Sequence, residues 1–297
     1  MRPSSLLSVR SARPLALILA FALAAAALGC GSDSASQPEG GASPRPATET
    51  AAMEHIHGLG VRGDTLSIAT HAGLWSAPAG QTKATPVGAS RQDIMGFSVL
   101  GPARFIGSGH PGPGQNLPPN LGLIESRDGG KSWKSISLSG EADFHVLESL
   151  GQRVYGFDGT QGRLMVSSDG GRTWQQRSSP APVFSLAIDP RDPDTTVAAT
   201  ERGLYTSTDA GRTWQALRPD TAGLLAWPSR DALYLVEGTG AVQVSADAGR
   251  RWQPAGSIGG EPTAFIAAGD DLYVALADAT VKRSADRGRS WTLRATP

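Results

Sequence analysis

The five histidines of this 297-residue chain are its clearest candidates for chemistry, and all of them lie in its first half. They are His55, His57, His71, His110 and His145. Imidazole nitrogens and carboxylate oxygens together bind Zn²⁺, Cu²⁺ and similar ions. We therefore predict His57, His71, His110 and His145 as metal ligands, with zinc or copper as the ion. No other cofactor is indicated. The spacing matches no known ligand motif, so only the fold can bring these residues together.

Acidic side chains accompany the histidines and open two further interpretations. Glu54, Asp93, Glu141 and Asp143 are candidates for the paired carboxylates of a glycoside hydrolase. In the third interpretation the histidines and acids only cap loops by hydrogen bonding, and the protein is a binding or scaffold module. The residues alone leave these three interpretations open.

The elements that must position these residues follow from an internal repeat. The copies are SRDGGKSW at 126–133, SSDGGRTW at 167–174, STDAGRTW at 207–214, SADAGRRW at 245–252 and SADRGRSW at 284–291. Their starts are 41, 40, 38 and 39 residues apart. This period suits a four-stranded propeller blade. The segments between the copies are β-rich runs such as VFSLAI and DLYVAL, which excludes helical repeats.

Each residue type in the octapeptide has a mechanical reason. The aspartate accepts backbone N–H bonds within a turn, the glycine supplies a positive φ, and the tryptophan packs between blades. The aspartates are Asp128, Asp169, Asp209, Asp247 and Asp286. Five of the seven tryptophans occupy the last position of the octapeptide, which indicates a repeated structural role.

These octapeptides resemble the Ser-x-Asp-x-Gly-x-Thr-Trp repeat, the Asp-box or BNR repeat, over most of residues 55–297. The repeat occurs in sialidases, some glucanases, sortilin-type receptors and photosystem II assembly factors. The segments HIHGLG, ATHAGLW and SGHPGPG also resemble small bacterial lipoproteins labelled glycosyl-hydrolase-like or sialidase-like. The resemblance implies a β-propeller, as in WD40 and YVTN repeat proteins, with the Asp-boxes on the face opposite the ligand site. It says little about chemistry.

The fold class that we predict is all-β, a single six-bladed propeller of four-stranded blades. A degenerate unit, GLWSAPAGQTK at 73–83, precedes the five copies. The expected blades are residues 53–88, 89–139, 140–180, 181–220, 221–258 and 259–297. A seventh blade would need about 40 further residues.

In such a blade, strand one starts and strand two ends on the top face, opposite the Asp-boxes. All five histidines fall at such positions in blades 1–3, as do the candidate acids, and the loop 107–120 rises beside His110. Blades 4–6 carry no histidine. We therefore expect a ligand site on the top face over blades 1–3.

Sialidase chemistry proper is not favoured, because it uses a tyrosine nucleophile and an arginine triad. The four tyrosines lie in strand contexts such as GLYTS, and the family's Phe-Arg-Ile-Pro segment is missing. Asp-box glucanases form their cleft between two propellers, and one is expected here. We predict a ligand-binding module, with a glycoside hydrolase acting on an extracellular or envelope glycan as the alternative and a protein-binding assembly factor as the second. Whether the protein is an enzyme stays open.

The N-terminal segment predicts export and lipid anchoring. Arg2, Arg10 and Arg13 precede an apolar run of about 14 residues, too short to span a bilayer. The run ends in Ala-Leu-Gly-Cys, which resembles a bacterial lipobox, and Cys30 is the only cysteine. We predict a signal peptide at 1–29, a lipidated Cys30 with a flexible linker at 30–52, and the propeller at 53–297. The expected location is extracytoplasmic, on a cell membrane.

The charge balance limits the partners. Loss of three arginines from a chain with 27 basic and 27 acidic side chains leaves a net charge of −3. A near-neutral domain without a basic run is a poor nucleic-acid binder. We expect a monomer that meets the membrane only through its lipid, with a small molecule, glycan or metal ion on the top face and an envelope protein as a further candidate partner.

Overall fold

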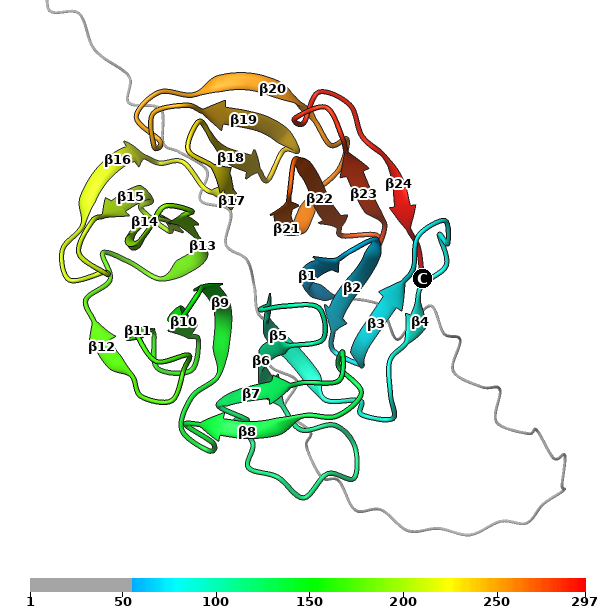
Figure 1. The fold of residues 1–297 in the computed structure, drawn as a ribbon. Coiled ribbons are helices and arrows are strands. Elements are labelled where there is room, and N and C mark those ends of the chain that lie inside the picture. Colours follow the sequence, from blue (N-terminus) through cyan, green and yellow to red (C-terminus); the bar gives the residue numbers. More distant parts are fainter. Residues whose placement is uncertain (1–54) are drawn as a thin grey trace, which may run out of the picture. The chain divides into compact units, whose positions relative to one another are not determined.

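The computed structural model describes residues 55–297, so Glu54, Cys30 and the expected signal peptide and linker lie outside the described part. The described strands form six four-stranded antiparallel sheets, each with its strands in chain order. Figure 1 shows these sheets arranged around a central axis, with the first strand of each sheet innermost and the fourth at the rim. The propeller is therefore all-β and six-bladed, as the repeat predicts. Within residues 55–297, no helix is long and apolar enough to span a bilayer.

The strand bounds follow the expected blades. Blade 1 holds β1 (Ile56–Arg62), β2 (Thr65–Thr70), β3 (Gly73–Ala77) and β4 (Thr85–Pro86). Blade 2 holds β5 (Asp93–Val99), β6 (Phe105–His110), β7 (Leu123–Ser126) and β8 (Lys134–Ser137). Blade 3 holds β9 (Phe144–Leu150), β10 (Arg153–Asp158), β11 (Arg163–Ser167) and β12 (Gln175–Arg177). Blade 4 holds β13 (Val183–Asp189), β14 (Asp192–Thr200), β15 (Gly203–Ser207) and β16 (Gln215–Pro219). Blade 5 holds β17 (Gly223–Ser229), β18 (Ala232–Glu237), β19 (Ala241–Ser245) and β20 (Gln253–Ser257). Blade 6 holds β21 (Pro262–Ala268), β22 (Asp271–Leu276), β23 (Val281–Ser284) and β24 (Thr292–Ala295).

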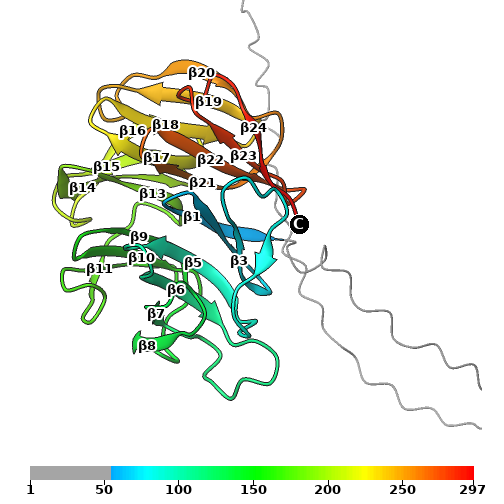
Figure 2. The same cartoon turned by 45° about the vertical axis from the view of Figure 1, so that its right-hand side comes forward.

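The inner strands β1, β5, β9, β13, β17 and β21 form a closed ring, in which each strand contacts the next and β21 contacts β1. Both views show β1 between β5 and β21 (Figure 1, Figure 2). A glycine permits the close approach of β1 to blade 2. A Cβ added at Gly58 would lie 2.9 Å from the Cβ of Phe97, a distance that carbon atoms do not tolerate. This glycine follows His57 directly, so the same approach brings His57 close to β5.

The five Asp-boxes form the turns between the third and fourth strands of blades 2–6. In each box a buried serine hydroxyl donates to the aspartate and accepts the N–H of the fifth residue, as Ser167 does with Asp169 (2.7 Å) and Gly171 (2.8 Å). The aspartate also accepts the N–H of the seventh residue, here Thr173 at 2.9 Å. Equivalent serine–aspartate bonds occur at Asp128, Asp209, Asp247 and Asp286. These bonds fasten each hairpin and lower the pKa of the aspartates, to about 2 at Asp128.

The fifth position of every box is glycine because the turn packs on the preceding blade. Gly171 has a φ of 86°, and a Cβ there would lie 2.1 Å from the Cδ2 of Leu123 in blade 2. The fourth position also has a positive φ, but a Cβ there meets only the ends of flexible side chains at Gly129 and Gly170, and Ala210, Ala248 and Arg287 occupy it in blades 4–6. Only the glycine that meets a neighbouring blade is therefore constant.

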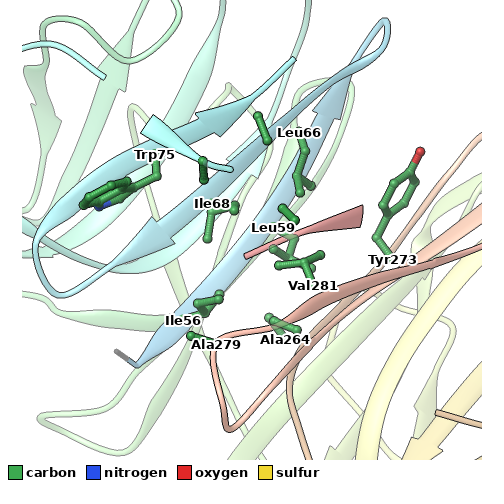
Figure 3. Close-up of a cluster of buried hydrophobic side chains, with 13 residues drawn as sticks. Ile56, Leu59, Leu66, Ile68, Trp75, Ala264, Tyr273, Ala279 and Val281 are labelled. Atoms are coloured by element: carbon green, nitrogen blue, oxygen red, sulfur yellow. The ribbon is translucent and has the colours of Figure 1, made fainter. Parts of the chain in front are cut away.

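Six clusters of buried side chains fill the six boundaries between neighbouring blades. At five of them the box tryptophan packs against the cluster, as Trp174 does between blades 2 and 3. Figure 3 shows the sixth cluster, in which Ile68 and Trp75 of blade 1 meet Tyr273 and Val281 of blade 6. The hydrophobic core is thus divided among the six boundaries between the blades, which holds the inner strands at fixed positions.

Blade 1 lacks an intact Asp-box, and contacts from Arg294 and Thr296 of blade 6 fasten it instead. The guanidinium of Arg294 donates to backbone carbonyls of blade 1, including those of Ala77 (2.7 Å) and Asp64 (3.0 Å). Thr296 bonds the backbone of Thr82 and Ala84. These contacts fasten the last blade to the first.

Candidate functional site

The histidines gather at the end of the propeller away from the Asp-boxes. The backbone N–H groups of Gly129 and Gly170 in two boxes donate to the carbonyls of Ala103 and Gln152, which lie in the turns after the first strands. The boxes therefore share the end at which the inner strands finish. The histidines instead lie where the inner strands begin and the second strands end, as the blade geometry predicts.

Asp93 is the centre of a first group, which we call the Asp93 triad: His57, His71 and Asp93. The Nδ1 of His71 lies 2.6 Å from the Oδ2 of Asp93, and the Nε2 of His57 lies 3.7 Å from its Oδ1. The rings of His57 and His71 meet edge to face at 4.5 Å. Ligand atoms from the three side chains all lie within 4.8 Å of one another, so the triad could hold a metal ion.

Asp143 is the centre of a second group, the Asp143 triad: His110, Asp143 and His145. The Oδ2 of Asp143 lies 2.7 Å from the Nε2 of His145 and 3.3 Å from the Nε2 of His110. The Nδ1 of His110 donates to the carbonyl of Pro119 at 2.8 Å, so the loop after β6 fixes the orientation of that ring. The side chain of Asp143 is only 3% exposed.

The same geometry produces both triads, one blade apart. His71 follows the second strand of blade 1 and meets the first residue of β5, and His110 ends the second strand of blade 2 and meets the residue before β9. Blade 2 contributes to both, because Asp93 and His110 are paired across β5 and β6. The N–H of Phe144 donates to the buried hydroxyl of Ser108, which holds β9 against blade 2.

Electrostatics distinguish the two triads. Burial, helped by the neighbouring histidines, lowers the pKa of His57 to about 3, so its imidazole is neutral at neutral pH. The hydrogen bond that His145 donates to Asp143 raises the pKa of His145 and favours its charged form. A neutral imidazole offers a lone pair to a metal, and an imidazolium does not. The Asp93 triad is therefore the better prepared for an ion.

Two buried atoms of the Asp93 triad have no hydrogen-bond partner among the described residues: the Nε2 of His57 and the Oδ1 of Asp93. A buried polar atom without a partner carries a desolvation cost. These atoms face each other across 3.7 Å. Metal–nitrogen and metal–oxygen bonds of about 2.0–2.2 Å would span that gap, so an ion between them would satisfy both atoms.

The structure divides the four histidines that the sequence groups as ligands of one ion. His57 and His71 share Asp93, whereas His110 and His145 share Asp143. Asp93 was expected as a catalytic carboxylate, and the structure places it among the metal-ligand candidates. The ring of the fifth histidine, His55, meets the ring of His71 edge to face, with the ring centres 5.0 Å apart.

The structure describes three of the four candidate catalytic carboxylates, Asp93, Glu141 and Asp143. Asp93 and Asp143 each contact two histidines, and the exposed Glu141 lies in the turn before β9. Glu54 lies outside the described residues.

Below the histidines, the central channel holds two cavities of about 80 and about 250 Å³. His57, Met95 and His145 line the upper cavity, and Glu148 lines both. The sequence interpretation did not single out Glu148. The sequence feature that could have identified it is a charged residue between Leu147 and Leu150 on an inner strand, which is expected to face the channel.

Comparison with known proteins agrees with the fold. The family described as "Sortilin, neurotensin receptor 3" matches residues 122–238. No curated protein matches the sequence. Among solved structures, a chain of a nidogen/laminin complex has a TM-score of 0.62 at 15% identity, with 79% of this chain and 94% of that chain covered.

Two further structures carry the propeller in other contexts. YCF48 from Cyanidioschyzon merolae has a TM-score of 0.50 at 15% identity, with 81% of this chain and 85% of that chain covered. The GH74 xyloglucanase from Xanthomonas campestris has a TM-score of 0.54 at 16% identity, over 81% of this chain. This chain spans only 45% of the xyloglucanase. The protein is thus a BNR-type, Asp-box β-propeller similar in structure to YCF48 and GH74 propellers, and at these identities the likeness concerns the fold alone.

Proposed function

We propose that this protein is an exported, lipid-anchored binding module that holds a transition-metal ion, Zn²⁺ or Cu²⁺, at His57, His71 and Asp93. The observation that carries the proposal is the pair of unpartnered buried atoms, the Nε2 of His57 and the Oδ1 of Asp93, with His71 on the other oxygen of the same carboxylate. Two imidazoles and a carboxylate suit both ions.

The position of the triad supports binding from outside the propeller. The side chain of His71 is 47% exposed, whereas those of His57 and Asp93 are 19% and 18% exposed. An ion would therefore be reached from solvent on one side and held by buried groups on the other. Three protein ligands leave a tetrahedral ion one open position, which a water molecule or a ligand group can fill.

Metal content tests the proposal. The full chain, purified without a polyhistidine tag and incubated with Zn²⁺ or Cu²⁺, should retain one equivalent of metal by elemental mass spectrometry. His57→Ala should lose that metal, and the matched variant His145→Ala should keep it, because His145 belongs to the other triad. Absence of metal from the unaltered protein, or equal loss in both variants, would contradict the assignment.

The proposal of export and lipid anchoring rests on the N-terminal segment, whose apolar run leads to Cys30, the only cysteine of the chain. The hydrolase interpretation remains a prediction.

A further inference from the structure

The lower cavity of the central channel, which we call the chamber, has one ionisable side chain in its lining. It measures about 250 Å³ and is lined by the second halves of the inner strands. Its walls include Leu59, Phe97, Leu186, Trp227 and Phe265. Since a water molecule occupies about 30 Å³ of liquid, the chamber has room for a small organic molecule.

Glu148 is that ionisable side chain. No hydrogen bond or ion pair joins it to a described residue, and the two hydroxyls that line the same cavity, Ser98 and Ser149, bond each other at 2.8 Å. Burial raises the pKa of Glu148 to about 8. The charged form of an acid without a partner is costly, so Glu148 stays mostly protonated at neutral pH unless a cation pairs with its carboxylate.

The side chains that line the chamber indicate which kind of molecule would compensate the charge of Glu148. Aromatic rings of Phe97, Trp227 and Phe265 attract organic cations through their faces, and the aliphatic walls suit a hydrocarbon chain. A hydrated metal ion would need several oxygen ligands, and the chamber presents one carboxylate. An anion or a neutral molecule would leave the carboxylate unpaired.

We propose that the lower cavity is a binding site for a small primary organic ammonium, whose charged group pairs with Glu148 and whose hydrocarbon chain lies against the leucine and aromatic walls. The site is separate from the Asp93 triad. Glu148 lines the wall between the two cavities, and no residue of the triad lines the lower one.

Titration calorimetry with butylammonium chloride tests this site on the full chain in a mild detergent. We expect one equivalent to bind, with an affinity that falls at least tenfold in Glu148→Gln and is unchanged in Glu201→Gln, a substitution at an exposed turn. 1-Butanol, which has the same chain without the charge, should bind at least tenfold more weakly. This comparison uses the unaltered protein, so it holds even if a variant folds poorly.

The pH dependence adds an independent readout. Because the carboxyl group must lose its proton to pair with the ammonium, binding at pH 7 should release a proton and tighten between pH 7 and pH 9. No other ionisable side chain lines the lower cavity, and His57 and His145 line the upper one. Equal binding of butylammonium and 1-butanol, equal binding to Glu148→Gln, or no binding at pH 8.5 would overturn the proposal.

Discussion

At the scale of single residues, the end of the propeller that carries the histidines and the channel below it show two ways to accommodate polar groups. Asp143 is nearly fully buried and meets two histidines, so its charge is compensated within the protein. Glu148, three residues after His145 on β9, meets none. The same strand thus carries a compensated and an uncompensated acid, and only the second should make stability depend strongly on alkaline pH.

The first prediction concerns Glu148→Gln. The folded-state pKa of Glu148, about 8, lies above the ordinary value of 4.5, so the folded state binds the proton more tightly than the unfolded state. Its contribution to stability is fully present below about pH 4.5 and is lost as the pH rises through 8. Glutamine cannot ionise. The variant should therefore exceed the unaltered protein in free energy of unfolding by about 1–3 kcal/mol at pH 9, and the difference should shrink towards pH 5.

Urea denaturation at pH 5, 7 and 9 measures this difference. The histidines near the channel titrate in both proteins, so their contributions cancel in the comparison. A difference that stays constant from pH 5 to pH 9 would show that Glu148 does not titrate in this range in the folded protein.

At the scale of elements, the Asp-box is a turn that is fitted to the neighbouring blade. In the box of blade 3 the fourth and fifth residues both adopt a positive φ, yet only the fifth meets a side chain across the blade boundary. Substitutions at two neighbouring glycines of the same box can therefore distinguish the effect of backbone strain on stability from the effect of packing.

The second prediction uses that pair. Gly171→Ala would place a methyl group 2.1 Å from the Cδ2 of Leu123, on top of the strain at a φ of 86°. It should lower the free energy of unfolding by about 2–5 kcal/mol. Gly170→Ala has a similar φ, meets only the flexible end of Gln152, and should cost about 1 kcal/mol or less. Thermal denaturation of both variants checks this order, and equal losses would refute the packing argument.

The blades could be predicted from the sequence because their signal is local. The octapeptides recur at intervals of 38–41 residues, and every one became a turn between third and fourth strands. The position of the histidines at the opposite end followed from strand order alone. Their division between Asp93 and Asp143 could not be predicted, because it depends on which second strand ends beside which first strand across a blade boundary. Glu148 was not predicted for the same reason, because the residues that line its cavity include residues of the five other blades.

At the scale of the whole propeller, the ring must close without an intact first Asp-box. Arg294 bonds the carbonyls of Asp64, Ala77, Pro78 and Gln81, and burial lowers its pKa, which shows how far its charge is withdrawn from solvent. The third prediction is that Arg294→Ala lowers the free energy of unfolding by about 1.5–3 kcal/mol. The exposed Arg289→Ala should have almost no effect. Denaturant unfolding compares the two, and similar stability of both variants would mean that the ring closes by other contacts.

The fourth prediction concerns attachment to the membrane. If Cys30 carries the lipid, Cys30→Ser should move the protein from the membrane fraction to the soluble extracytoplasmic fraction, and intact-mass analysis should show the loss of the acyl groups. The fold of residues 55–297 should be unaffected, since they contain all 24 strands. A variant that stays in the membrane fraction would require another means of attachment.

The pairing of Asp93 with His110 across β5 and β6 has a kinetic consequence. These two residues belong to different triads, so a local opening of this one hairpin disturbs both triads at once, although the contact between Asp143 and His145 lies outside it. The amide hydrogens of β5 and β6 then report on both groups in a single hydrogen-exchange experiment. A metal ion bound to the Asp93 triad would slow amide hydrogen exchange around the Asp143 triad without contacting any of its residues.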